Sequence, residues 1–85
     1  MITPIKLSWQ ERCRQVADYH RRSLADNPKH RVEDTANDLA KSIGRVSEEL
    51  MLANWMKRDP KVEKFKQIQD ALDYVKAQKR LEKMS

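Results

Sequence analysis

Apolar residues recur at every third or fourth position through most of the chain, the spacing that puts them on one face of an α-helix. The first such stretch, residues 8–26, has a stripe that begins with Trp9, Cys13 and Val16. Stretches with the same period follow over residues 32–41, 42–58 and 60–78. No segment alternates apolar and polar residues as a half-buried β-strand does. The pattern therefore predicts an all-α fold of four helices.

Capping and breaking residues set the expected helix ends. Ser8 and Glu11 have the spacing of a capping box, so the hydroxyl and the carboxylate can each bind a free N–H group at the start of the first helix. That helix is expected to end before Pro28, because the residue before a proline is biased away from helical backbone. Asp59 and Pro60 suit the N-cap and the first position of the last helix.

The last segment predicts one helix or, if it breaks near residues 66–67, a short helix and a longer one. Residues 1–7 are expected to form an extended lead, and residues 79–85 a charged tail that frays. The fold would then be a single domain over residues 1–78. Basic residues near the C-terminus are expected to keep the chain soluble: Lys76, Lys79, Arg80 and Lys83.

The composition excludes several kinds of site. A chain of 85 residues and 10.1 kDa buries one thin core and leaves little room for a catalytic cleft. The single glycine rules out Gly-rich phosphate loops, which need at least two. The single cysteine, Cys13, is expected to be buried and allows no disulfide within the chain, and His20 and His30 lack metal-ligand spacing. We therefore expect no metal, no cofactor, no small-molecule substrate and no enzymatic activity.

Charge and hydropathy narrow the class of partner. No apolar run approaches the roughly 18 residues that a membrane span requires. The first residues lack the charged and apolar regions of a signal peptide, so a cytoplasmic protein is expected. The net charge of +5 favours an anionic partner without identifying it. The basic excess lies mostly before residue 32, while residues 32–58 carry four basic and five acidic side chains.

Residues 35–52, TANDLAKSIGRVSEELML, have the pattern of two short amphipathic helices joined by a tight turn. The small Ala36 suits the point where two steeply crossing helices approach each other. Val46 and Leu50 are expected to pin the second helix to the first. The other face of the second helix would stay free for the major groove of DNA. Trp55 is expected to complete the core against the last helix, or else to join a patch for a second subunit.

Seven positions of this stretch resemble the helix-turn-helix of ParB/KorB-like partition proteins, whose pattern is A-x-x-L-G-K-S-x-x-x-V-x-x-x-L-x-L. The matching residues are Ala36, Leu39, Lys41, Ser42, Val46, Leu50 and Leu52. The resemblance implies a helix-turn-helix core over residues 32–56 that binds double-stranded DNA. In length the chain is more similar to small phage or plasmid regulators than to complete partition proteins.

Three positions need separate interpretation. Ala40 takes the place in the turn that is usually glycine, and it would need a positive φ angle there. The Glu48-Glu49 pair lies in the expected reading helix, where carboxylates repel phosphate. Glu48 could accept a hydrogen bond from cytosine, or the pair could be solvated or bound to an arginine. Gly44 would either let DNA approach the helix closely or occupy a tight packing position.

The first two turns of the reading helix supply the expected base-reading residues. These are Ile43, Gly44, Arg45, Ser47 and Glu48. Arg45 is the strongest candidate, since a guanidinium can bind guanine O6 and N7 through two hydrogen bonds. Phosphate contacts are expected from a second set: Arg21, Arg22, Lys29, His30, Arg31, Thr35, Lys41 and Ser42. Thr35 could instead simply pack, and the five basic residues from Arg21 to Arg31 could form a solvated cationic face.

The sequence thus predicts sequence-selective binding of double-stranded DNA by a small transcriptional regulator of phage or plasmid type, acting in a bacterial host cell or its nucleoid. A homodimer on a two-fold site is expected, because one module of this size makes limited contact area. Two alternatives stay open. The near-neutral charge of residues 32–58 fits a protein-interaction adaptor on the same scaffold. A DNA-packaging or replication accessory protein would use a similar module.

Overall fold

The computed structural model of the protein describes residues 8–84, and these residues form helices joined by loops and turns. The helices are α1 (Trp9–Asp26), α2 (Val32–Asp38), α3 (Ile43–Arg58), α4 (Pro60–Glu63) and α5 (Ile68–Met84). The all-α prediction is confirmed, with five helices in this part of the chain. The extended lead expected over residues 1–7 lies outside the described residues.

Side chains at the predicted capping positions start two of the helices. Ser8 Oγ accepts a hydrogen bond from the Glu11 N–H at 3.2 Å, which satisfies a free donor of α1. Asp59 Oδ1 accepts from the Lys61 N–H at 3.0 Å, with Pro60 at the first position of α4. The α1 helix ends at Asp26, two residues before Pro28, as predicted.

The turn between α2 and α3 explains why α2 is shorter than its predicted range. The helix ends at Asp38 instead of residue 41, because Ala40 adopts a left-handed φ of 54°. The Lys41 N–H then donates to the Ala36 carbonyl at 2.8 Å, and the Ala40 N–H donates to the Asn37 carbonyl at 3.3 Å. This pair of bonds is a Schellman motif, which usually has glycine at the left-handed position. The positive φ angle expected of Ala40 is confirmed.

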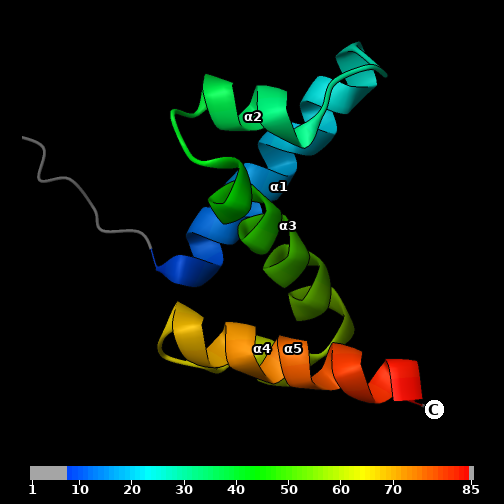
Figure 1. Cartoon of the computed structure of the whole chain (residues 1–85). Helices are drawn as coiled ribbons and strands as arrows, with labels where there is room; N and C mark the ends of the chain where they lie inside the picture. The colour runs from blue at the N-terminus through cyan, green and yellow to red at the C-terminus, as the bar shows by residue number, and fades with distance from the viewer. Residues whose placement is uncertain (1–7, 85) are drawn as a thin grey trace, which may run out of the picture.

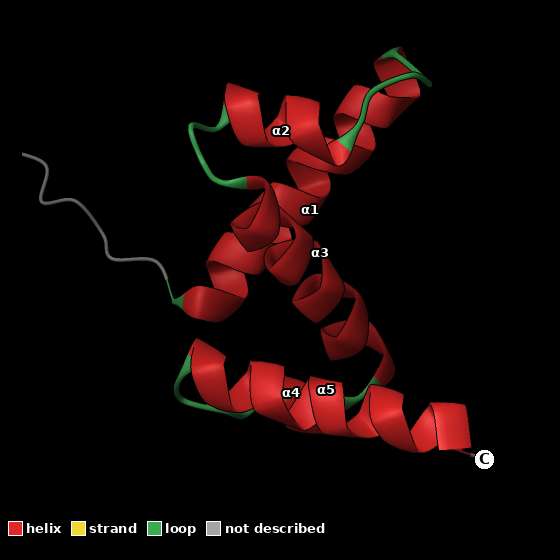
Figure 2. Ribbon diagram, viewed as in Figure 1, coloured by secondary structure: helices red, strands yellow, loops and turns green. Residues whose placement is uncertain are grey.

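Figure 1 shows how the helices are arranged. The α1 and α3 helices cross near the middle of the molecule, α2 packs at one end of the crossing, and α4 and α5 pack at the other. The molecule is flat, with extents of 44 × 38 × 20 Å. The short connections between successive helices are visible in Figure 2. Within residues 8–84, no helix is both long enough and apolar enough to span a bilayer.

Two clusters of buried side chains hold these helices together. The smaller cluster joins Val16 of α1, Ala36 of α2 and Val46 of α3. The expected packing of α3 on α2 through Val46 is confirmed, and Val46 is fully buried in this cluster. The larger cluster joins α1, α3, α4 and α5 through these buried residues: Trp9, Cys13, Leu52, Ala53, Trp55, Met56, Val62, Ala71, Leu72 and Val75.

The C-terminal segment packs on the larger cluster. Trp55 is 8% exposed against α5, so its predicted place in the core is confirmed. Trp9 anchors the start of α1, where its indole N–H donates to the Phe65 carbonyl at 2.9 Å. The predicted break divides the segment into α4 and α5. No helix end marks the boundary expected at residue 79, because α5 continues through it to Met84. Fraying of this end stays a prediction, and Ser85 lies outside the described residues.

Candidate nucleic-acid interface

The start of α3 presents an accessible face. Ser42 caps the helix, and its Oγ accepts from the Arg45 N–H at 3.1 Å. Val46 is fully buried against α1 and α2, which fixes the rotation of α3 about its own axis. Four of the five predicted base-reading residues are therefore exposed, and the fifth is half-buried: Ile43, Gly44, Arg45 and Ser47, with Glu48 the half-buried one.

Gly44 has no packing role within the described chain. It lies in the first turn of α3 with a negative φ angle, so the backbone does not require glycine there. A Cβ atom added at this position would meet no other atom within 4 Å. The tight-packing interpretation of Gly44 is therefore wrong. The other interpretation of Gly44, a close approach of DNA to the helix, stays a prediction.

The two glutamates of α3 differ in their surroundings. Glu48 is half-buried, whereas Glu49 is only 2% exposed. Lys41 donates from Nζ to both carboxylate oxygens of Glu49, at 3.0 and 3.2 Å. The negative charge of Glu49 is thus withdrawn from the accessible face and neutralised by a lysine, where the sequence suggested solvent or an arginine. Lys41 was expected to bind phosphate, and its ammonium group is committed to Glu49 instead.

A basic hollow lies beside the start of α3. It is lined by Arg12, Lys41, Ser42, Arg45 and Glu49. Arg12 comes from the first half of α1, and the sequence interpretation missed it. Arg12 is exposed, next to the buried Cys13 in the chain, and it reaches this place because α1 crosses α3 here. The sequence indicates that Arg12 is exposed, because it adjoins a residue of the apolar stripe. It does not contain the angle at which α1 crosses α3, and that angle brings Arg12 to the hollow.

Thr35 packs inside the fold and is not available for the phosphate contact suggested by the sequence. Its side chain is fully buried, and its Oγ1 lies 2.7 Å from His20 Nδ1 and 2.6 Å from His30 Nε2. A hydroxyl group in this position is inaccessible to a phosphate. The half-buried His30 uses its Nε2 atom in the hydrogen bond with Thr35. Burial, and secondly the nearby His30, lower the pKa of His20 below its ordinary value. The three side chains join α1 to the start of α2.

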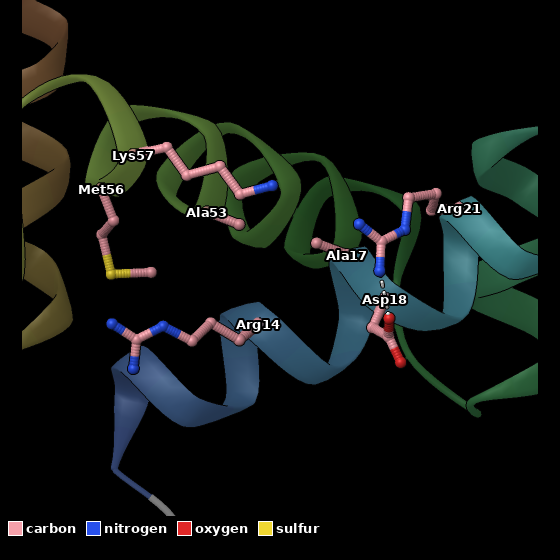
Figure 3. Close-up of a pocket in the computed structure, with 7 residues that line it drawn as sticks. All are labelled: Arg14, Ala17, Asp18, Arg21, Ala53, Met56 and Lys57. Carbon is pink, nitrogen blue, oxygen red and sulfur yellow. Dashed lines mark hydrogen bonds and ion pairs between the residues drawn. The ribbon is translucent and has the colours of Figure 1, made fainter.

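The two arginines near the end of α1 do not line the basic hollow. Arg21 and Arg22 both pair with Asp18, at 2.6 and 3.1 Å. Figure 3 shows Arg21 beside a second hollow, between α1 and the C-terminal half of α3. This hollow of about 360 Å³ has an apolar floor and charged walls, formed by Arg14, Ala17, Asp18, Arg21, Ala53, Met56 and Lys57. The structure therefore does not bring Arg21 together with Arg45.

The remaining predicted phosphate residues lie on the connector between α1 and α2. Lys29 and Arg31 are exposed there, at the opposite end of α2 from the turn. The Arg31 backbone N–H donates to Asp34 Oδ2 at 3.0 Å, so this residue caps α2 through its main chain and leaves its guanidinium exposed. Of the predicted set, the structure thus places Ser42 and Lys41 beside Arg45, and the other members elsewhere.

The arrangement has the chemistry of an anion-binding surface on a rigid helix. Arg12 and Arg45 present exposed guanidinium groups beside the N-terminus of α3, where free N–H groups also favour negative charge. Within residues 8–84, no three His, Cys, Asp or Glu side chains gather closely enough to hold a metal ion.

Comparisons of the chain with protein-family models, with curated proteins and with solved structures gave no match.

Proposed function

We propose that the protein binds double-stranded DNA sequence-selectively, with the start of α3 in the major groove. The observation that carries this proposal is the accessible first turn of α3, where Gly44 and Arg45 are exposed while Val46 on the opposite side is fully buried. A helix held in this way presents its N-terminal residues to base edges. The basic hollow with Arg12 supports it, because guanidinium groups next to a reading helix bind phosphate and set its register.

The small contact area of one α3 helix leads to a proposal about the oligomeric state. A face of two helical turns makes few contacts, so we propose a homodimer that reads two half-sites one turn of DNA apart. Selection of bound fragments from a random DNA library tests both points together. A palindromic motif supports a dimeric regulator of phage or plasmid type. A non-palindromic motif keeps DNA binding and argues against the two-fold arrangement.

Replacement of Arg45 by alanine tests the base-reading role. The variant is expected to bind the selected DNA site roughly 5- to 150-fold more weakly, because a bidentate contact to guanine contributes about 1–3 kcal/mol of discrimination. Binding to a scrambled site should change much less. Both affinities can be measured by fluorescence anisotropy, with Arg22→Ala as the control for loss of one positive charge. Equal losses on both DNA sites would reduce Arg45 to a phosphate contact.

Gly44→Ala separates stability from binding. Alanine is favoured over glycine in a helix by up to about 1 kcal/mol, and no atom obstructs the new methyl group, so thermal stability is expected to rise. Affinity for the selected DNA site is expected to fall at the same time, because the methyl group occupies the space into which DNA would come. Asn54→Ala, farther along the exposed side of α3, is the matched control. A variant that is more stable and binds equally well contradicts the close approach of DNA at Gly44.

The exposed Ile43 favours a second candidate function. It is 52% exposed at the start of α3, and exposed apolar side chains also anchor protein partners. A protein-interaction adaptor would use the same surface without binding DNA. A gel-shift on mixed genomic fragments at two salt concentrations distinguishes the two functions. Absence of any shifted band at low salt would support the adaptor and refute the DNA-binding proposal.

A further inference from the structure

The last two and a half turns of α5 carry a row of positive charge that has no part in the proposed function so far. Lys76, Lys79, Arg80 and Lys83 are all exposed and together line one shallow hollow. Within residues 8–84, none of the four lies within ion-pair distance of a carboxylate. By contrast, Arg21 and Arg22 of α1 both pair with Asp18, and Arg58 pairs with Glu82 at 3.0 Å. We call these four residues the α5 basic row.

The spacing of the row keeps its charges close together. Positions three and four apart on a helix are neighbours, so Lys76 adjoins Lys79 and Arg80, and Lys83 adjoins the same two residues. Like charges at this spacing repel each other and destabilise a helix. A polyanion laid along the row would relieve that repulsion at several points at once, and each neutralised phosphate would release counterions from the DNA.

The row adjoins the proposed reading face. Lys79 Nζ lies 3.7 Å from the sulfur of Met51 on α3. Met51 is seven residues after Gly44, close to two full turns, so the two residues lie on the same face of α3 about 10 Å apart along its axis. Figure 1 shows the C-terminal half of α5 beside the C-terminal end of α3. The face of α3 is therefore bordered by positive charge at both ends, with Arg12 and Arg45 at its start.

We propose that the α5 basic row is a second phosphate-binding surface for the duplex whose major groove receives α3. This inference rests on the proposed function. The major groove is bordered by phosphates on both sides, so basic side chains that flank a reading helix can bind the backbone while the helix contacts the bases. The row holds the duplex through its backbone and makes no choice of sequence.

An anionic membrane is the other surface that a basic helix could bind. Leu81 and Met84 are exposed on α5, at 59% and 79%. In helical projection, however, these two residues lie roughly 90° or more from the centre of the basic row, so the row and the apolar side chains face different directions. The contact between Lys79 and Met51 places the row beside the proposed reading helix, which favours DNA over a membrane as its partner.

The test is a triple variant, Lys76→Gln, Arg80→Gln and Lys83→Gln, which leaves Lys79 and its contact with Met51 in place. Binding to the selected DNA site is measured at several salt concentrations. The slope of log K against log[salt] is expected to become shallower by roughly 2 to 3, since each lost phosphate contact removes about 0.9. The preferred DNA sequence should stay the same. Circular dichroism melting confirms that the variant is folded.

The matched control removes three charges elsewhere. Lys61 in α4 and Lys64 and Lys66 on the connection to α5 are all exposed, so their change to glutamine alters the net charge by the same amount. Equal slopes for both triple variants, or an unchanged slope for the first, overturn the α5 row while leaving DNA binding intact. A wild-type protein that binds no DNA overturns both proposals. In that case, binding to vesicles rich in phosphatidylserine that is lost in the first variant reassigns the row to membranes.

Discussion

Replacement of Lys41 by methionine is expected to lower the free energy of unfolding by about 3 kcal/mol, within the range seen when one partner of a buried ion pair is removed. Glu49 is 2% exposed, and Lys41 is the cation that bonds both of its carboxylate oxygens. Without the ammonium group, a buried carboxylate would lose the cation that bonds both of its oxygens. Urea denaturation followed by circular dichroism gives the free energy directly.

The control for this variant removes both partners. In the double variant Lys41→Met with Glu49→Leu, most of the lost stability should return, because two apolar side chains can replace a buried ion pair at little cost. Arg12→Ala removes an exposed cation from the same hollow and should change stability by less than about 0.5 kcal/mol. If Lys41→Met were as mild as Arg12→Ala, the pair between Lys41 and Glu49 would be a minor element of the fold.

Thr35→Val is the second variant with a large expected effect, a loss of about 1–3 kcal/mol. Valine has nearly the same shape as threonine, but it offers no partner to the half-buried rings of His20 and His30, and each lost hydrogen bond costs about 0.5–1.5 kcal/mol. Thr35→Ser keeps the hydroxyl group and is the matched control. A valine variant as stable as the serine variant would show that the histidines find other partners.

The same pair of histidines predicts how stability depends on pH. The pKa of His20 is lowered in the folded protein, chiefly by burial and secondly by His30, from its ordinary value of 6.5. The unfolded chain therefore takes up a proton more readily than the folded one, so stability is lost as the pH falls below 6.5 towards the folded-state pKa. Denaturation of the wild type and Thr35→Val at several pH values measures both effects.

Local signals were sufficient to predict most of the fold. Ser8 and Asp59 cap helices through residues two or three positions away, and Pro28 acts on its own neighbour, so the printed sequence contains the whole interaction. The same holds for Ala40, whose left-handed backbone follows from the short turn. Apolar spacing also placed Val46 in the core between α2 and α3. Each of these features depends on one helix or one turn.

The candidate site was less predictable because its contacts cross between helices. Thr35 looks like a surface residue of α2 until His20 of α1 and His30 of the connector converge on it. Arg12 joins the site only through the crossing of α1 and α3. Charge in the last helix suggested a loose tail, yet Arg58 pairs with Glu82 there and stacks on Trp55, 4.5 Å from the ring centroid. Such pairs require the angle between helices, which the sequence pattern does not contain.

The division of the core into two clusters has a consequence for spectroscopy. Trp9 and Trp55, the two tryptophans of the chain, both belong to the larger cluster, whereas α2 packs through the smaller one. Tryptophan emission therefore reports the packing of α1, α3 and α5. It is expected to change little if α2 alone detaches from the rest of the fold. The ring protons of His20 and His30 flank Thr35 of α2, so their nuclear magnetic resonance signals would report that second half. The chain thus contains separate natural probes for its two clusters.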